Sequence, residues 1–163
     1  MKVILCDESH YEIFLNSFFS FSIDNKEKLE QELKQIFLKL ESYYHINVNG
    51  FYHVTLYHDS NTGVVLEVEK EDMDYYPFST HEIELRIQIE REHPFLYKLE
   101  DYYLLTPSLL KKGEVYYYQN AFYYFIKKPL KELEKIYLFE YSIIDYKDWK
   151  DILKAQNKIK KGN

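Results

Sequence analysis

Residues 50–68 read GFYHVTLYHDSNTGVVLEV, and the architecture predicted for the first part of the chain follows from this stretch. Two apolar runs alternate with other side chains on either side of the turn-forming cluster Ser-Asn-Thr-Gly at residues 60–63. A period of two places every second side chain on one face of a strand. The pattern therefore predicts a β-hairpin with one buried face.

An amphipathic helix is predicted just before this hairpin, over residues 25–44. Asp24 stands where an N-cap belongs, and Glu27 three residues later completes a capping-box arrangement. Apolar side chains then recur at helical spacing, at Leu29, Leu33, Ile36, Phe37, Leu40 and Tyr44. Because an isolated two-stranded ribbon is marginal in water, we expect the helix to pack on the hairpin. Two short strands, at residues 2–6 and 11–15, are expected before it.

The second half of the chain echoes the order strand, helix, hairpin. Residues 82–90 alternate apolar and polar side chains and predict its opening strand. A short helix is expected from Pro94 to Tyr103. A second hairpin is expected over residues 115–126, turning at residues 119–121, where Asn120 best accepts a positive φ.

The remaining elements complete an α+β fold of two small α/β two-layer halves with a C-terminal helix. They are a helix from Pro129 to Tyr137, a closing strand at residues 138–144 and a helix capped by Asp145. The predicted boundaries are 1–72 for the N-terminal half, 73–81 for a joint, 82–146 for the C-terminal half and 147–163 for a basic helix and tail.

Composition adds limits on location and chemistry. The single cysteine, Cys6, rules out an internal disulfide, and we take it also to rule out a cysteine-based zinc site. No signal peptide and no apolar run of membrane-spanning length are found, so we expect a cytoplasmic protein without a membrane partner. Aromatic residues make up 18% of the chain, partly through AT-rich codons, and predict a tyrosine-lined core.

The charge pattern argues against nucleic acid as the main partner. The formal net charge is −6, and residues 1–72 carry 13 acidic against 6 basic side chains. An acidic body repels a phosphate backbone. The C-terminal residues 145–163 are basic, with six lysines against three aspartates, but this tail is short.

Motifs for catalysis are absent from the sequence. The four glycines lie scattered at positions 50, 63, 113 and 162 and form no phosphate-binding loop. A nucleophile elbow and a His-Glu-x-x-His zinc helix are also missing. We therefore predict no catalytic residue, metal or cofactor. The alternative is a small enzyme whose site forms by convergence of His45, His58 and Asp59.

The tyrosines of the second hairpin are the strongest candidates for binding. A thin layer cannot bury all aromatic side chains of residues 116–125, so some must face outward. Outward aromatic side chains with polar tips are typical of protein interfaces. We select Tyr117 and Tyr123 as partner-binding residues. Stacking on nucleic-acid bases, and mimicry of nucleic acid, are the alternatives.

Several stretches resemble the MecA family of adaptor proteins for the Clp unfoldase of Gram-positive bacteria. The N-terminal strands, the helix after Asp24 and the hairpin of residues 50–68 look like the family's N-terminal domain. Residues 115–124 look like its aromatic hairpin, and residues 138–142 look like its closing strand, with Ser142 in place of the family's glycine.

This resemblance implies a regulatory adaptor that acts through protein–protein contact. The acidic N-terminal half would meet one partner. The tyrosine hairpin, with Glu140 and Tyr141 of the closing motif, would meet the other. The implied partners are a Clp unfoldase and a regulated substrate, and the implied role is delivery of that substrate for proteolysis.

Overall fold

The computed structural model describes residues 1–16, 19–71 and 82–160. Two compact units make up the chain, the first from residues 1–58 and 64–91, the second from residues 59–63 and 92–163. Each contains a β-sheet with helices, so the predicted α+β fold is confirmed. The predicted joint at residues 73–81 lies outside the described residues.

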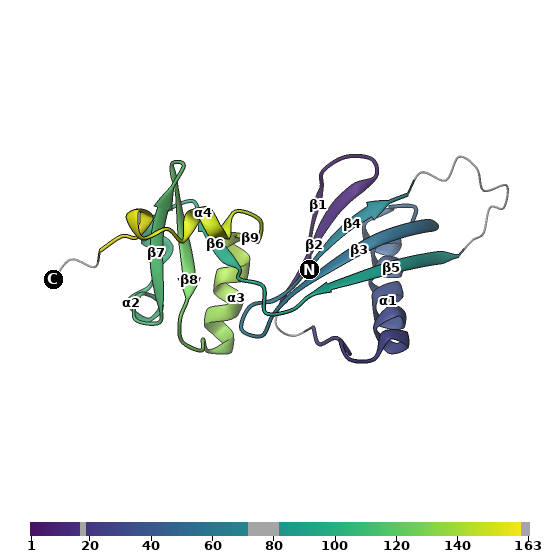
Figure 1. The fold of residues 1–163 in the computed structure, drawn as a ribbon, viewed down its shortest axis with the longest axis horizontal. Helices are drawn as coiled ribbons and strands as arrows, with labels where there is room; N and C mark the ends of the chain where they lie inside the picture. Colours follow the sequence, from purple (N-terminus) through teal and green to yellow (C-terminus); the bar gives the residue numbers. More distant parts are fainter. Residues whose placement is uncertain (17–18, 72–81, 161–163) are drawn as a thin grey trace. The chain divides into compact units, whose positions relative to one another are not determined.

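The first unit is a five-stranded sheet with one long helix along it (Figure 1). The strand order is β1-β2-β4-β3-β5. The strands are β1 (Lys2–Leu5), β2 (His10–Asn16), β3 (Gly50–Asp59), β4 (Gly63–Lys70) and β5 (Ile83–Glu90). Strands β3 and β4 are the hairpin expected from residues 50–68.

Helix α1 (Lys26–Tyr44) covers one face of this sheet and confirms the predicted amphipathic pattern except at Tyr44, which is 45% exposed. Its buried stripe meets the inward side chains of the strands, and the Phe37 and Tyr52 rings pack edge to face at 4.8 Å. The N-cap, however, is Asn25, whose side chain accepts a hydrogen bond from Lys28 N at 3.1 Å. Asp24 instead forms an ion pair with Arg91 at 2.7 Å.

Strand β5 pairs with the first sheet, whereas residues 82–90 were predicted from the sequence to open the second half. It runs parallel to β3, with Ile83 opposite Gly50 and Glu90 opposite Tyr57. Its predicted alternation is correct, because its isoleucine and leucine side chains pack against the first core. Alternation marks a strand and its inner face but does not name the neighbouring strand.

The second unit is built on a four-stranded antiparallel sheet in the order β7-β8-β6-β9. The strands are β6 (Leu96–Leu99), β7 (Gly113–Tyr118), β8 (Ala121–Ile126) and β9 (Ser142–Asp145). The helices are the 3₁₀ turn η1 (Tyr102–Leu104), α2 (Pro107–Leu110), α3 (Glu132–Tyr141), α4 (Trp149–Ile152) and the 3₁₀ turn η2 (Ala155–Asn157).

Two predicted elements of the second unit change type. The expected helix from Pro94 to Tyr103 is strand β6 followed by η1, because β6 pairs on one side with β8 and on the other with β9. Residues 138–141 are the last turn of α3 and not strand, because Leu138 and Phe139 are buried as helix residues. Tertiary pairing overrides local spacing in both places.

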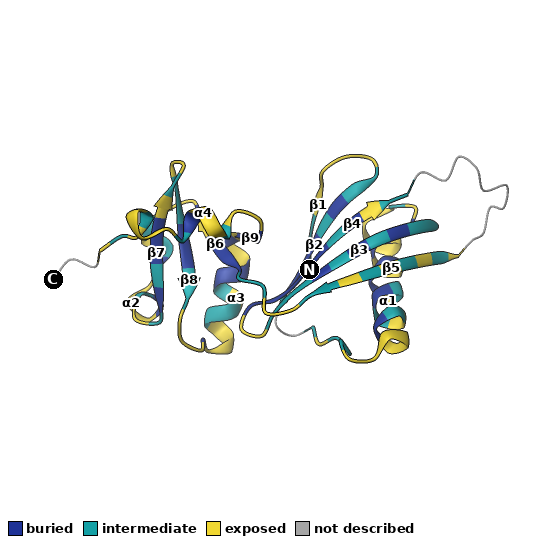
Figure 2. Ribbon diagram, in the orientation of Figure 1, coloured by how far each residue is buried: buried dark blue, intermediate teal, exposed yellow. Residues whose placement is uncertain are grey.

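The hairpin β7–β8 turns through two residues. Gln119 and Asn120 have φ angles of 46° and 60°, and Tyr118 faces Ala121 across the turn. Positive φ at both central positions is the geometry that matches the twist of a two-residue hairpin. The expectation for Asn120 is confirmed, with a turn one residue shorter than predicted. Figure 2 shows the exposed tip of this hairpin above its buried strand centres.

Candidate interaction surface

The register of the β7–β8 hairpin separates its aromatic side chains into two sets. Tyr116 lies opposite Tyr123, and Tyr117 lies opposite Phe122. Directly opposed residues in an antiparallel pair point to the same face, and successive residues alternate. Tyr117 and Tyr123, selected together from the sequence, therefore point to opposite faces of the sheet.

Tyr123 belongs to the core of the second unit. It is 5% exposed and packs with Tyr116, Leu96 and Ile152 of α4. Burial raises the pKa of the Tyr123 hydroxyl above its ordinary value, with the carboxylates of Asp145 and Asp148 as smaller causes. Its selection as a partner-binding residue is corrected by this burial, because α4 covers the face on which it lies.

Tyr117 lies in a chain of aromatic rings at the surface, which we name the aromatic strip: Tyr103, Tyr102, Phe122 and Tyr117. Their neighbouring ring centres are 6.5, 5.8 and 5.0 Å apart in that order. Tyr103 is 91% exposed and Tyr117 46% exposed, while the two middle rings are half-buried. The strip thus joins turn η1 to the hairpin, which sequence spacing did not predict.

A second ring pair, Tyr137 and Tyr141 of α3, is linked to turn η1 through Tyr137. The Tyr137 hydroxyl of α3 donates to the Leu104 carbonyl of η1 at 2.9 Å, and the Tyr137 ring lies 4.9 Å from that of Tyr141. Tyr141 is 57% exposed, and its neighbour Glu140 is exposed as well. Glu140 and Tyr141, both expected from the sequence to meet a partner, therefore lie at the surface, at the C-terminal end of α3.

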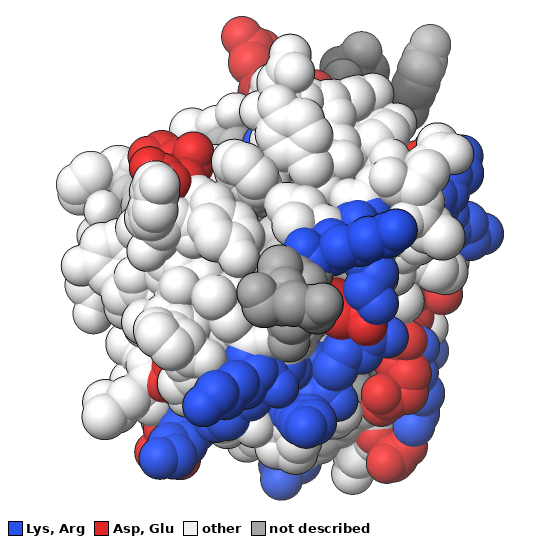
Figure 3. All heavy atoms as spheres, turned by 90° about the vertical axis from the view of Figure 1, so that its left-hand side faces the viewer, with Lys and Arg blue, Asp and Glu red and all other residues white. Residues whose placement is uncertain are grey.

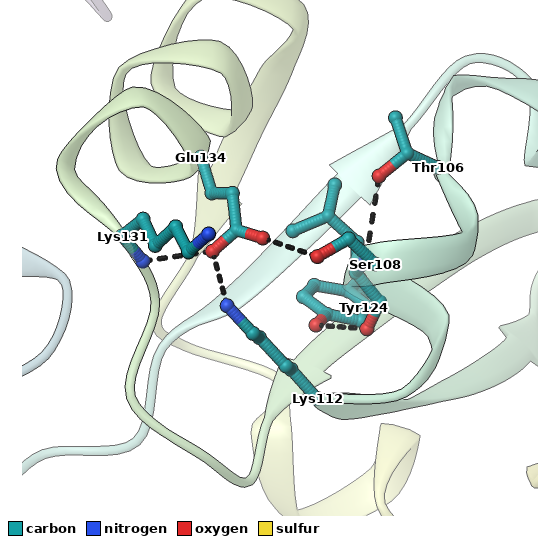
Figure 4. A network of polar contacts seen from close by, with 7 residues as sticks. Thr106, Ser108, Lys112, Tyr124, Lys131 and Glu134 are labelled. Atoms are coloured by element: carbon teal, nitrogen blue, oxygen red, sulfur yellow. Dashed lines mark hydrogen bonds and ion pairs between the residues drawn. The ribbon is translucent and has the colours of Figure 1, made fainter.

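Polar contacts fix α2 and α3 beneath this surface (Figure 4). Glu134 of α3 accepts hydrogen bonds from the Ser108 hydroxyl at 2.6 Å and from Lys131 N at 2.7 Å. It also pairs with Lys112 at 2.7 Å. These donors lower the pKa of the Glu134 carboxyl to about 2, and the hydrogen bond from Lys112 is the largest cause. The buried Tyr124 hydroxyl donates to the Leu109 carbonyl at 2.7 Å, which attaches α2 to the sheet.

A lysine-lined pocket of about 380 Å³ adjoins the aromatic strip through Tyr102, which belongs to both. Its six lysines come from three segments that are distant in sequence: Lys111, Lys112, Lys127, Lys128, Lys158 and Lys160. The C-terminal segment reaches this place as an added edge, where Ile159 N donates to the Val115 carbonyl at 2.8 Å. Figure 3 shows basic side chains gathered over the lower and right-hand parts of this face, with acidic side chains beside them.

Carboxylates compensate only part of this charge. Glu114 lies 2.5 Å from Lys158 and 3.7 Å from Lys127, and these lysines with the Tyr116 hydroxyl hold the pKa of the Glu114 carboxyl below its usual range. Lys112 is engaged by Glu134. Within residues 82–160, the structure shows no carboxylate paired with the pocket's other three lysines, at positions 111, 128 and 160. The pocket therefore favours anionic groups.

The histidine site proposed as an alternative is not assembled among the described residues. His45 caps the C-terminus of α1 in the left-handed conformation, and His58 lies on β3. Asp59 accepts hydrogen bonds from Asn61 N and Thr62 N inside its turn. No group of metal-competent side chains in the described ranges includes any of these three residues.

In comparisons with known proteins, no protein family, curated protein or solved structure matches the chain. Among the described residues, no helix is long and apolar enough to cross a membrane.

Proposed function

We propose that the protein is a non-enzymatic adaptor that binds a protein partner through the aromatic strip of the second unit. The observation that carries this proposal is the continuous chain of four rings from Tyr103 to Tyr117, with both outer rings exposed. Tyrosines supply large contact area at low entropic cost and keep a polar tip for hydrogen bonding. Such rings are enriched among residues that dominate binding energy.

The strip is also held in place before any partner arrives. The Tyr117 hydroxyl donates to the Asn120 side chain at 3.4 Å, and Tyr102 packs against Phe122. Rings that are already ordered lose less conformational freedom on binding, so more of their contact energy appears as affinity. A protein surface with an apolar patch and acceptors for tyrosine hydroxyls fits this strip.

The more specific form of the proposal is delivery of a substrate to a Clp unfoldase, in the manner of MecA. Its support is the sequence resemblance of residues 50–68 and 115–124, both of which form hairpins. The closing motif is not the strand that the resemblance implies. Glu140 and Tyr141 are the last residues of helix α3, and strand β9 begins at Ser142. The strip and the Tyr141 region are the surfaces that such a partner would meet.

A paired substitution with a matched control tests the proposal. We expect Tyr103→Ser with Tyr117→Ser to weaken binding of a purified Gram-positive Clp unfoldase, and capture of partners from a lysate, by more than about tenfold. The control is Tyr43→Ser with Tyr44→Ser on α1, where the rings are 74% and 45% exposed. Equal binding by both double variants would contradict the use of the strip.

A second candidate function, binding of single-stranded nucleic acid, is favoured by one observation. Tyr102 joins the aromatic strip to the lysine-lined pocket, and base-stacking rings beside lysines are the usual arrangement in single-strand binders. Residues 92–163 carry 13 lysines against ten acidic residues, in contrast to the acidic remainder of the chain.

Lysine substitutions separate the two candidates. Lys111→Gln with Lys128→Gln should abolish salt-dependent binding of a fluorescent oligonucleotide and leave protein capture unchanged. The control is Lys26→Gln with Lys28→Gln, which removes two exposed lysines from α1. If the unaltered protein binds no oligonucleotide at low salt, this second candidate is wrong.

A further inference from the structure

The hairpin β1–β2 places three side chains with metal-binding atoms on one face. Tyr11 of β2 points into the core, so His10 and Glu12 on either side of it point to the opposite face. Cys6 follows β1 and lies across from His10, because Cys6 N donates to the His10 carbonyl at 2.9 Å. The sulfur, one imidazole nitrogen and a carboxylate oxygen of these residues all lie within 4.8 Å of one another.

The turn between Cys6 and His10 is held rigidly by Asp7. One Asp7 carboxylate oxygen accepts hydrogen bonds from Ser9 N at 2.8 Å, from the Ser9 hydroxyl at 3.0 Å and from His10 N at 2.7 Å. This closes the loop and fixes the separation of the Cys6 and His10 backbones. The two side chains therefore face each other without further ordering of the main chain.

A glutamate from the neighbouring strand β4 stands behind the histidine. Glu67 Oε1 lies 3.4 Å from the buried His10 Nε2. The Tyr57 hydroxyl donates to the other Glu67 oxygen at 3.0 Å. Metal-binding histidines are commonly oriented by a carboxylate of this kind, which selects the tautomer and raises the basicity of the ring.

We propose that Cys6, His10 and Glu12 form a binding site for a divalent transition-metal ion, with Zn²⁺ as the favoured occupant. A thiolate, an imidazole and a carboxylate together suit Zn²⁺ and its neighbours and are unsuited to Mg²⁺ or Ca²⁺, which take oxygen ligands. Bonds to zinc of about 2.0–2.3 Å place ligand atoms about 3–4 Å apart. Small rotations of the exposed Cys6 side chain close the remaining distance.

A single cysteine excludes a zinc site built on several cysteines but not this mixed set, so the exclusion of every cysteine-based zinc site from the sequence was too broad. Three protein ligands complete a tetrahedral zinc site when water takes the fourth position. A zinc site with water in the fourth position can accept an exchangeable ligand, whereas a structural site with four protein ligands is closed. The proposal is independent of the aromatic strip, which lies in the other unit.

Cobalt and zinc titrations of the full chain test the site. We expect one equivalent of Co²⁺ to bind with a thiolate-to-metal charge-transfer band in the near ultraviolet, and Zn²⁺ to displace it. Cys6→Ser should remove that band and weaken binding more than about tenfold, and Glu12→Gln should weaken binding in the same direction. The matched control is His53→Gln on β3, which should bind as the unaltered protein does.

Thiol reactivity supplies a second measurement that needs no variant. Cys6 is exposed, so a maleimide should label it readily, and one equivalent of Zn²⁺ should slow that labelling by more than about tenfold. Labelling that proceeds unchanged with Zn²⁺ present would overturn the proposal. So would cobalt binding that survives Cys6→Ser with the same spectrum, or that falls equally in His53→Gln.

Discussion

Tyr117 lies with its ring 5.0 Å from that of Phe122, its direct partner across the β7–β8 hairpin. This contact places Tyr117 on the face that carries the aromatic strip. The adjacent cross-strand pair, Tyr116 and Tyr123, lies on the opposite face of the sheet, where α4 buries it. One hairpin therefore supplies both a surface and part of a core, and its register decides which aromatic side chain does which.

Substitution of Tyr123 should destabilise the fold, and substitution of Tyr103 should not. Tyr123→Ala removes a buried ring and should lower the free energy of unfolding by about 3–5 kcal/mol, the range for large aromatic side chains. Tyr103→Ala alters an exposed side chain and should stay within about 0.5 kcal/mol. Urea denaturation midpoints measure both. A shift for Tyr123→Ala as small as that for Tyr103→Ala would show that Tyr123 is not buried.

The cap of α1 gives a second prediction. Asn25→Ala removes the acceptor of the Lys28 N–H and should cost about 0.5–2 kcal/mol. Asp24→Ala is the matched control, since it removes only an ion pair with Arg91 whose side chains are 88% and 57% exposed. Such pairs contribute about 0–1 kcal/mol. A larger loss of stability in the Asp24 variant than in the Asn25 variant would show that the helix begins one residue earlier.

Local pattern was sufficient for the elements whose partners lie nearby in sequence. The helix of residues 26–44 and both hairpins follow from periodicity and turn chemistry, because their buried faces meet adjacent segments. Strands β5 and β6 were misplaced or mistyped because their partners are distant along the chain. Pairing with a remote strand leaves no local sequence signal beyond alternation.

The candidate surface was predictable only in part for the same reason. The exposure of Tyr117 and Tyr141 agrees with their selection from the sequence. Tyr123 is buried, because the hairpin register places it on the face opposite to Tyr117. The lysine-lined pocket assembles from three segments, of which only the pair at residues 127–128 lies directly after the hairpin. The pair at residues 111–112, directly before β7, was the signal that could have found it.

Gly113 should not tolerate a side chain. A Cβ at this position would lie 2.5 Å from the Phe125 carbonyl oxygen and 2.5 Å from the Tyr124 ring. Neither neighbour can move freely, because one is strand backbone and the other is a buried ring held by its hydroxyl. Gly113→Ala should therefore cost about 1–3 kcal/mol through overpacking, measured by thermal or urea unfolding. An unchanged midpoint would mean that the start of β7 packs more loosely than the structure shows.

The contacts of Glu134 predict a dependence of stability on pH. Hydrogen bonds and the Lys112 ammonium lower the pKa of its carboxyl from 4.5 to about 2 in the folded protein, whereas the unfolded chain keeps the ordinary value. The unfolded state therefore binds a proton first, so this stabilisation is fully present above about pH 5. It is lost as the pH falls from the ordinary value towards about 2.

Glu134→Gln isolates this contribution. The variant lacks the carboxylate that Lys112, Ser108 and Lys131 share, so it should be less stable than the unaltered protein near neutral pH. The difference between the two free energies of unfolding should shrink as the pH is lowered from about 5 to about 2, because protonation removes the same charge. Glu132→Gln is the matched control, since Glu132 is an exposed acid of the same helical turn that does not share these three contacts. A pH-independent difference for Glu134→Gln, or an equal pH dependence for Glu132→Gln, would assign the effect to general charge at the start of α3 and not to the contacts of Glu134.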